Sequence, residues 1–353
     1  MLTNNINFKN FRLRKSNKKI IYLFKKLIKE DNEILNSMKQ SFKDPYSKET
    51  IKRLKKFSKF RVIGMGGSVL GSRAIYNFLK EKIKKIFYFE DNLGRSETLK
   101  KNQKNSLNLI ISKSGNTLET ISNFNTIVNF SKKNIFITEN KKSFLMDLAK
   151  KLKSDVIYHN NFIGGRYSVL SEVGMLPAEL MGLDPKKFRR YNFLVKNKKF
   201  VNSLVHNVSN TLTLIKKKKF NSIILNYDEN SIDLINWYQQ LIAESLGKKS
   251  KGILPIISNM PKDNHSLMQL YLDGFKNNFY TFFFVNQNFS TKINNNYLLK
   301  THSFLKNKNF NDIKKSQFIA TEKVFSQKNI PFRSFNLKKR NEETLGELFI
   351  FFI

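Results

Sequence analysis

From residue 60 onward, short apolar runs alternate with longer segments whose apolar residues recur at helical spacing, and this alternation constrains the fold most. In the first half of the chain the runs predict buried strands at 61–65, 85–89, 107–112 and 134–138. Amphipathic helices fit between them at roughly 69–84, 117–131 and 143–153. Strands that alternate with helices in this way are typical of a doubly wound parallel sheet.

The same alternation returns near residue 220. It predicts strands at 221–227, 252–257, 280–285 and 331–337, and helices at 231–247, 264–276 and 311–327. A chain of 353 residues has room for about two domains if each takes ~150 residues. We therefore predict an α/β protein with two doubly wound parallel-sheet domains after an N-terminal helical lead-in, divided as 1–55, 56–195 and 196–353.

The composition narrows the classes of protein and site. Apolar residues make up 40% of the chain, enough for sizeable cores, so wholesale disorder is not expected. Cysteine is absent, which excludes disulfides, a thiolate nucleophile and sulfur-ligated zinc. No apolar run approaches the ~18 residues of a membrane span, and the basic N-terminus lacks a signal-peptide stretch. We expect a cytoplasmic protein that does not contact membranes.

The formal net charge of +37 invites a nucleic-acid interpretation, because lysine and arginine neutralise phosphates. Only 11 of the 64 basic residues are arginine, however, and arginine is favoured for reading base edges. The chain is also rich in Lys, Asn, Ile and Phe, which A/T-rich codons encode, so base bias explains much of the excess. We predict no nucleic-acid partner, while the positive field would steer a small anionic substrate.

The segment Gly64–Gly71, GMGGSVLG, directly follows a predicted strand and opens a helix. Its glycines let backbone N–H groups approach an anion, and the helix N-terminus adds its positive dipole. A dinucleotide fingerprint fails at its sixth position, Val69, although Glu90 and Asp91 lie near the place of a ribose-binding carboxylate. A tight turn that holds no ligand is the alternative.

A second strand-to-helix junction, ISKSGNTLET, places the hydroxyls of Ser112, Ser114 and Thr117 around a glycine. Asn116 with Glu119 resembles a capping box and would mark the helix start. Hydroxyls and uncapped N–H groups together form a phosphate cradle that needs no metal. A well-capped helix without a ligand is the alternative, but two such junctions in one sheet favour a phosphorylated ligand at the switch point.

Three further segments carry candidate catalytic residues. Arg166 follows two glycines in GGRYSVLSEVGMLP, and its planar cation suits a developing oxyanion. Gln240 and Glu244 share one face of a predicted helix beside an apolar stripe, which could desolvate the carboxylate and make it a base. His265 lies at a predicted helix start, where the dipole keeps imidazole neutral. A surface arginine, a solvated glutamate and a capping histidine are the respective alternatives.

These five segments occur in the order and approximate spacing of the glucose-6-phosphate isomerase family, and the resemblance covers about residues 55–350. GGSVLG and SKSGNTLET resemble the two phosphate loops of that family. GGRYSVLSEVGMLP and QQLIAESLGK resemble its two signature blocks, and DNHSLMQLYLDG resembles its bacterial-type histidine block. The resemblance implies two sugar isomerase (SIS) domains, a cytoplasmic homodimer active in glycolysis and gluconeogenesis, and no metal or organic cofactor.

The resemblance also implies roles for single residues. Glu244 would move a proton between C2 and C1 through a cis-enediolate, Arg166 would stabilise its charge and Gln240 would position sugar hydroxyls. His265 would help to open the ring in the partner's site, across the dimer interface. The sugar phosphate would be held by Gly67, Ser68, Ser112, Lys113, Ser114 and Thr117.

Some residues depart from the family pattern. Asn264 stands where the family has glutamine, and SGNT is closer to bifunctional phosphoglucose/phosphomannose isomerases. The family's ring-opening lysine lies beyond the equivalent of ETLGELFIFF, which predicts that the chain is a fragment with exposed Phe349, Phe351 and Phe352. The alternatives are therefore a bifunctional isomerase, a catalytically weakened sugar-phosphate-binding fragment and, more distantly, a dinucleotide-dependent enzyme.

Overall fold

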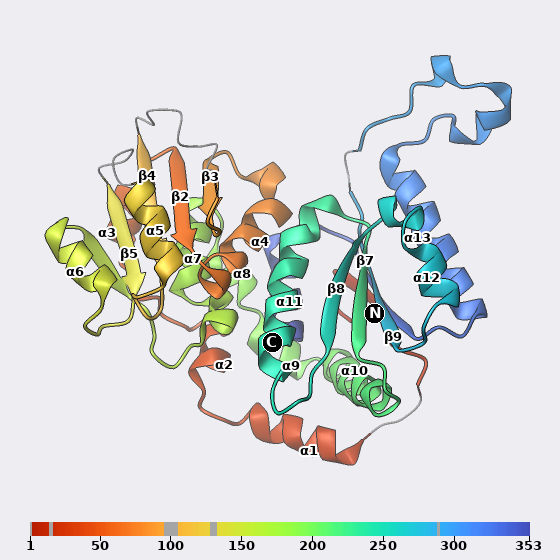
Figure 1. Cartoon of the computed structure of the whole chain (residues 1–353), viewed down its shortest axis with the longest axis horizontal. Helices are drawn as coiled ribbons and strands as arrows, with labels where there is room; N and C mark the ends of the chain where they lie inside the picture. Colours follow the sequence, from red (N-terminus) through yellow and green to blue (C-terminus); the bar gives the residue numbers. More distant parts are fainter. Residues whose placement is uncertain (1, 14–16, 95–104, 128–132, 288–289) are drawn as a thin grey trace. The chain divides into compact units, whose positions relative to one another are not determined.

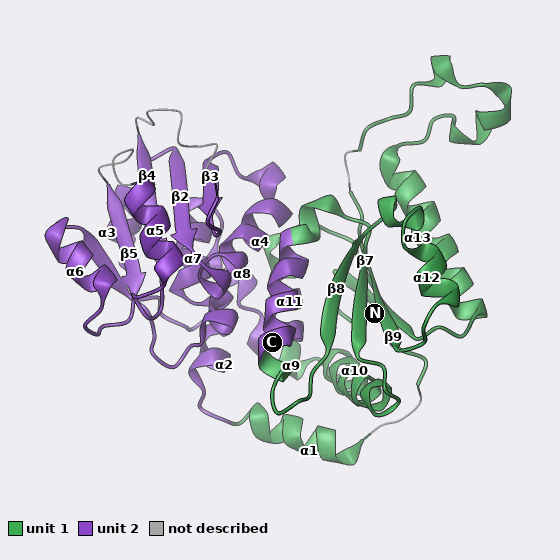
Figure 2. Cartoon of the chain, viewed as in Figure 1, with its two compact units in different colours: residues 1–29, 194–232, 245–344 green, residues 30–193, 233–244, 345–353 purple. Residues whose placement is uncertain are grey.

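The computed structural model describes residues 2–13, 17–94, 105–127, 133–287 and 290–353. Their contacts form two compact units, each assembled from separate parts of the sequence (Figure 2). Unit 1 comprises Met1–Lys29, Leu194–Ile232 and Ser245–Thr344, and unit 2 comprises Glu30–Phe193, Asp233–Glu244 and Leu345–Ile353. The domain boundaries predicted from the sequence, at 55/56 and 195/196, divide the chain into continuous segments and stay a prediction.

Unit 2 is built on a sheet of five strands, all parallel, in the order β3-β2-β4-β5-β6 (Figure 1). The strands are β2 (Lys59–Gly64), β3 (Ile86–Glu90), β4 (Ser106–Ile111), β5 (Asn134–Thr138) and β6 (Asp155–Tyr158). Every residue of β4 and β5 is buried, as expected for central strands covered on both faces. The four predicted strands of this half are confirmed, whereas β6 was not predicted because DVIY is short and polar at its start.

Helices pack on this sheet through a core that includes Ile63, Ile110, Phe124, Phe136 and Leu145. The helices α5 (Leu118–Ile127) and α6 (Phe144–Lys151) contribute residues to this core, whereas α4 (Leu70–Phe78) contacts β3 through the rings of Tyr76 and Phe87. The last residues of the predicted helix 117–131 lie outside the described residues. The other helices of this unit are α2 (Glu33–Ser37), α3 (Lys48–Leu54), α7 (Glu172–Leu180) and α8 (Pro185–Phe188).

Three helices cross from one unit to the other along the chain: α9 (Tyr191–Lys196), α11 (Ile232–Leu246) and α14 (Glu342–Phe352). Most of α11 and the end of α14 belong to unit 2, where the ring centroids of Trp237 and Phe349 lie 4.8 Å apart. Phe349 is fully buried and Phe351 is 4% exposed. The predicted exposure of these phenylalanines was wrong, because the apolar end of α14 packs against α11.

Unit 1 contains a second five-stranded sheet, in the order β1-β10-β9-β7-β8. Its strands are β1 (Ile6–Lys9), β7 (Asn221–Asn226), β8 (Leu254–Asn259), β9 (Asn278–Val285) and β10 (Phe332–Leu337). All pairings are parallel except that of β1 with β10. Its helices are α1 (Lys18–Leu27), α10 (Lys198–Lys216), α12 (Met268–Asp273) and α13 (Phe310–Gln327). The aromatic residues Tyr227, Phe282, Phe318 and Phe325 form part of its core.

The predicted α/β class with two doubly wound sheets is confirmed by these two topologies. The lead-in at 1–55 is helical in α1, α2 and α3, but it also supplies β1, which was not predicted. This strand pairs Ile6 with Leu337, and local sequence cannot show so distant a partner. The helix α10 was also not predicted.

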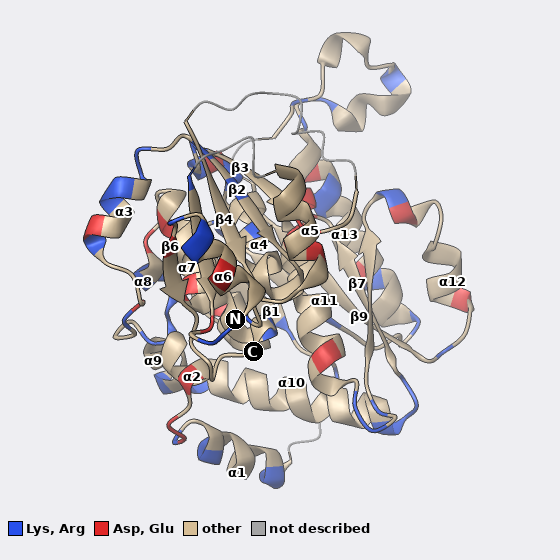
Figure 3. Cartoon of the chain, turned by 60° about the vertical axis from the view of Figure 1, so that its left-hand side comes forward, with Lys and Arg blue, Asp and Glu red and all other residues tan. Residues whose placement is uncertain are grey.

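Lysine and arginine occur on helices of both units, α1 and α3 among them (Figure 3). Among the described residues, no helix is both long enough and apolar enough to span a bilayer.

Candidate active site

The strand order of the unit 2 sheet reverses between the neighbouring strands β2 and β4 (Figure 1). Their last residues, Gly64 and Ile111, are paired in the register of the two strands. In open α/β sheets, ligands bind outside the carboxyl ends of the strands at such a switch point. Both of the predicted glycine and hydroxyl segments leave the sheet here. The topology therefore brings the two candidate phosphate loops together.

The first loop turns sharply after β2 through the 3-10 turn η1 (Gly66–Ser68). Gly66 has φ +52°, and a Cβ there would lie 2.6 Å from Gln240 Nε2. A Cβ at Gly67 would lie 2.2 Å from the carbonyl oxygen of Gly165. Glycine alone allows both approaches, so this loop lies directly against the segments that carry Gln240 and Arg166.

The second loop gathers its hydroxyls where β4 ends and α5 begins. Ser112 Oγ lies 2.8 Å from Thr117 Oγ1 and accepts the backbone N–H of Gly115 at 3.2 Å. Gly115 has φ +69°, which turns the chain toward α5. Ser114 is exposed at the rim of this turn. The first N–H groups of α5 have no intrahelical acceptor, so hydroxyls and helix N-terminus converge as an anion cradle needs.

The predicted capping box at Asn116 and Glu119 was wrong. The helix α5 begins at Leu118, and the Asn116 side chain accepts the backbone N–H of Phe144 at 2.9 Å instead. Phe144 is the first residue of α6, so Asn116 satisfies an open N–H group of the next helix along the chain. The second loop is thereby tied to the start of α6.

Arg166 lies in the 3-10 segment η5 (Gly165–Leu170). Its side chain is 24% exposed, and its Nη1 donates to Glu244 Oε2 at 3.3 Å. The guanidinium also lies over the ring of Tyr167, 4.7 Å from its centroid. Burial lowers the pKa of Arg166, but its interactions with Tyr167 and Glu244 outweigh burial and raise that pKa overall. Arg166 is therefore a permanent cation inside the site.

Gln240 and Glu244 lie one turn apart on α11, as predicted, and the Gln240 Nε2 donates to Glu244 Oε1 at 2.9 Å. Each oxygen of Glu244 therefore has a partner, one in Arg166 and one in Gln240. The Glu244 side chain is 49% exposed, which agrees with the alternative of a solvated glutamate rather than with desolvation by the apolar stripe. The Gln240 Oε1 is buried and has no hydrogen-bond partner within the described part of the chain, which leaves it able to accept a hydroxyl.

The start of α11 is fixed to α4 by an ionic network. Arg73 donates from Nε to Asp233 at 3.1 Å and from Nη1 to Asp91 at 2.6 Å, and Asn77 also donates to Asp233. The network fixes the helix that carries Gln240 and Glu244. It also engages Asp91, the carboxylate that a dinucleotide ribose would need, which argues against the dinucleotide alternative.

His265 belongs to unit 1, in a turn after η7 (Lys262–Asn264), and its side chain is exposed. The predicted helix start at 264 was wrong, because α12 begins only at Met268 and has six residues. The dipole argument for His265 therefore loses its basis. In the parts of the chain that the structure describes, no cluster of three or more His, Asp or Glu could hold a metal ion.

The sequence profile of the family named Phosphoglucose isomerase matches residues 2–349. The chain belongs to this family. It is 33% identical over 338 residues to the glucose-6-phosphate isomerase of Methanocaldococcus jannaschii, with 87% of this chain and 80% of that relative covered. It is 31% identical over 318 residues to that of Mycoplasmopsis pulmonis, with 82% and 74% covered.

A solved phosphoglucose isomerase structure shares the fold. The glucose-6-phosphate isomerase of Chlamydia trachomatis superposes with a TM-score of 0.65, covering 90% of this chain and 71% of that one. At 19% identity this similarity supports the fold alone.

The structure places nearly all residues that the phosphoglucose isomerase resemblance singled out within unit 2. Unit 2 holds Gly67, Ser68, Ser112, Lys113, Ser114, Thr117, Arg166, Gln240 and Glu244. Only His265 of that set belongs to unit 1.

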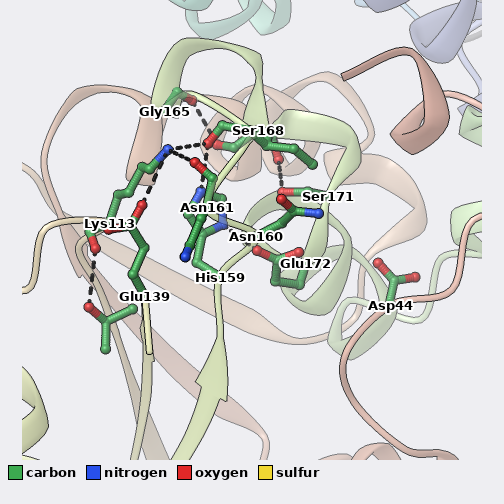
Figure 4. Close-up of polar contacts among 12 residues, drawn as sticks. Asp44, Lys113, Glu139, His159, Asn160, Asn161, Gly165, Ser168, Ser171 and Glu172 are labelled. Carbon is green, nitrogen blue, oxygen red and sulfur yellow. Dashed lines mark hydrogen bonds and ion pairs between the residues drawn. The ribbon is translucent and has the colours of Figure 1, made fainter. Parts of the chain in front are cut away.

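Sequence reasoning missed a polar cluster around His159 and Glu172 (Figure 4). His159, 3% exposed, follows β6 and contacts the carboxylate of Glu172, which is fully buried at the start of α7. Lys113 and Glu139 lie in the same cluster. The sequence held part of the evidence for this pair. Glu172 is the only charged residue in the mostly apolar stretch YSVLSEVGMLP, where a buried carboxylate without a partner would be costly.

Proposed function

We propose that this member of the phosphoglucose isomerase family interconverts glucose 6-phosphate and fructose 6-phosphate through a cis-enediolate. One observation carries the mechanism. The hydroxyl cradle, the only Arg–Glu pair at its rim among the described residues, and Gln240 all meet at one switch point, where Gly66 and Gly67 touch the other two segments. A sugar phosphate needs one anchor for its phosphate and one acid–base group for its carbonyl end.

The phosphate anchors at the second loop. Ser112, Ser114 and Thr117 offer hydroxyls there, and the open N–H groups of α5 add the helix dipole. Ser68 and the backbone of Gly67 and Lys113 complete the cradle. A phosphate held by hydroxyls and backbone groups needs no metal ion.

Glu244 is the base. Its carboxylate removes the proton from C2 of the open-chain aldose and returns it to C1, while the oxygen on C1 takes up a proton and the oxygen on C2 becomes the carbonyl. Arg166 stabilises the negative charge that develops on these oxygens, since its planar fork can bind two at once. The free carbonyl of Gln240 accepts a sugar hydroxyl and fixes the ring carbons beside Glu244.

The contact between Arg166 and Glu244 has a consequence for binding. Both Glu244 oxygens are engaged within the protein, by Arg166 at 3.3 Å and by Gln240 at 2.9 Å. A substrate oxygen that pairs with Arg166 releases one carboxylate oxygen for catalysis. The long Arg166 contact is the easier one to replace.

The proposal also covers how the sugar ring opens, how the protein assembles and where it acts. His265 assists proton transfer at the ring oxygen, and it does so in the partner's site of a homodimer. The protein acts in the cytoplasm, on sugar phosphates rather than on nucleic acid or membranes. The alternatives of a bifunctional isomerase and of a weakened sugar-phosphate-binding fragment are less favoured, because the base and the oxyanion cation are both present and in contact.

The test follows formation of glucose 6-phosphate from fructose 6-phosphate, coupled to an NADP-dependent dehydrogenase. The proposal expects turnover, and it expects glucose 6-phosphate deuterated at C2 to pass part of its label to C1 and lose the rest to solvent. Turnover without label movement between C2, C1 and solvent would contradict the enediolate route. Absence of turnover by the folded protein would contradict the function itself.

A further inference from the structure

The side chain of Lys113 reaches away from the hydroxyls of its own loop. Its Nζ donates to the carbonyl oxygens of Asn161 at 2.8 Å and of Ile163 at 2.9 Å (Figure 4). Both carbonyls lie just before Gly164 and Gly165, the two glycines that precede Arg166. The loop that we assign to the phosphate is thus bonded to the segment that we assign to the oxyanion.

His159 contacts the same segment from another direction. Its Nε2 lies 3.0 Å from the Ile163 carbonyl, which can only accept, so this nitrogen carries a hydrogen. Its Nδ1 contacts Glu172 at the start of α7. The Ile163 carbonyl therefore receives two donors, one from Lys113 and one from His159.

Two glycines, Gly164 and Gly165, lie between these anchors and Arg166. Gly164 and Gly165 have wide conformational freedom, and a Cβ at Gly165 would meet nothing within 4 Å. The Gly165 carbonyl accepts from Ser168 Oγ at 2.7 Å. The donors to Asn161 and Ile163 therefore help to set the direction in which the chain enters this glycine pair.

We propose that Lys113 is a positioning residue that couples the phosphate loop to Arg166. Its backbone borders the phosphate, while its ammonium fixes the carbonyls that precede Arg166. Movement of the loop on phosphate binding passes through this side chain to the guanidinium. The inference rests on the proposed function, because it assigns the phosphate to one loop and the oxyanion to Arg166.

Glu139 supplies the electrostatic balance and also a matched control. It is 6% exposed, and Lys113 Nζ lies 3.4 Å from its Oε1, while Lys141 pairs with its Oε2. Burial raises the pKa of Glu139, but Lys141 and Lys113 outweigh burial and lower that pKa below its ordinary value. Lys141 thus shares the carboxylate with Lys113, yet Lys113 alone of the two is bonded to Asn161 and Ile163.

The experiment compares Lys113→Met with Lys141→Met in the full chain, with kcat and KM for fructose 6-phosphate and the melting temperature measured for each. Both variants remove one cation from Glu139 and keep the length of the side chain. We expect Lys113→Met to lower kcat by roughly tenfold or more, toward the 10²-fold that a misplacement of about 1 Å can cause, with KM within about threefold. We expect Lys141→Met to leave both constants within about twofold.

A double variant tests whether Lys113 acts through Arg166. In an Arg166→Ala background the loss from Lys113→Met should disappear, because two residues that act as a unit are not additive. Lys113→Arg, which can donate to both carbonyls, should recover part of kcat and provides a folded variant if methionine lowers stability.

The outcomes separate this inference from the proposed function. Equal kcat for the two methionine variants, additive losses with Arg166→Ala, or a loss confined to KM would each overturn the positioning role. Full activity of Arg166→Ala would instead overturn the assignment of Arg166, whatever Lys113 does.

Discussion

The two sheets of this protein share the order of four parallel strands and differ at their switch points. The strand order β3-β2-β4-β5 in unit 2 corresponds to β8-β7-β9-β10 in unit 1, so the order reverses between β2 and β4 in one and between β7 and β9 in the other. After β2 and β4 come glycines and hydroxyls. At the end of β7 and after it stand Asn226 and Asp228, and after β9 come Asn286 and Gln287.

The second switch point is occupied by a carboxylate of the protein itself. Asp228 is 1% exposed and accepts from Arg340 Nη2 at 2.6 Å, from Gln287 Nε2 at 3.0 Å and from Ser231. These are donors of the kind that a phosphate would use. The difference teaches that topology places an anion site at the carboxyl end of the sheet, whereas the local residues decide whether a ligand or a side chain fills it.

The largest expected effect is a loss of kcat on mutation of the proposed base in unit 2, with no loss for a glutamate of unit 1. Glu244→Gln should lower kcat by roughly 10²–10⁴, the range for a positioned general base, because the amide cannot accept the C2 proton. KM should change much less, since the phosphate contacts remain. Glu229→Gln, an exposed glutamate just after the second switch point, is the matched control and should leave kcat unchanged. Near-normal turnover of Glu244→Gln would sink the assignment of the base.

Arg166→Lys should be nearly as damaging although the charge is kept. An ammonium cannot reproduce the planar fork that binds two oxygens, so we expect kcat to fall by about 10²–10³, as for loss of an oxyanion donor. The measurement is kcat per folded molecule together with the melting temperature. A lower melting temperature with unchanged kcat would mean that Arg166 supports the fold rather than the reaction.

Asp228→Ala should affect stability instead of catalysis. Arg340, with its side chain 9% exposed, would lose a buried anionic partner, and breaking such a pair costs about 3 kcal/mol or more. Denaturant unfolding measures the loss, and kcat of the folded fraction should stay within about twofold. A large fall in the kcat of folded Asp228→Ala would contradict this comparison, because the second switch point would then take part in catalysis.

The sequence predicted the buried strands well because their apolar runs are local signals, as in LNLIIS and NIFIT. It missed β1 and β6, whose sequences are short and depend on a neighbouring strand. Asn116 misled the capping prediction because its acceptor oxygen serves Phe144, a residue 28 positions away. A local sequence pattern cannot show whether a side chain bonds a backbone N–H group nearby in the chain or one far away.

Within the candidate site, residue types were predictable but contacts were not. Arg166 and Glu244 are 78 positions apart, and nothing in either segment predicts that they touch. The Lys113 side chain illustrates the same limit. The family resemblance assigned its backbone to the phosphate, and nothing in the sequence predicted that its Nζ bonds carbonyls 48 and 50 positions away. A long flexible side chain can act at a site that its backbone does not border.

The smallest expected effect is also the most direct test of the first switch point. Thr117→Val keeps the shape of the side chain and removes one hydroxyl from the cradle, which also frees Ser112 Oγ from its 2.8 Å contact. One hydrogen bond to a charged group contributes about 1.5 kcal/mol or more, so KM and the inhibition constant of inorganic phosphate should both rise about tenfold. Because Glu244 and Arg166 are untouched, kcat should change little. Ser231→Ala removes the corresponding hydroxyl at the second switch point, where it donates to Asp228, and should leave both constants unchanged. Equal rises of KM in the two variants would show that the anion site does not lie at the β2/β4 switch point. An unchanged inhibition constant of phosphate in Thr117→Val would show the same, and the proposed difference between the two sheets would then be wrong.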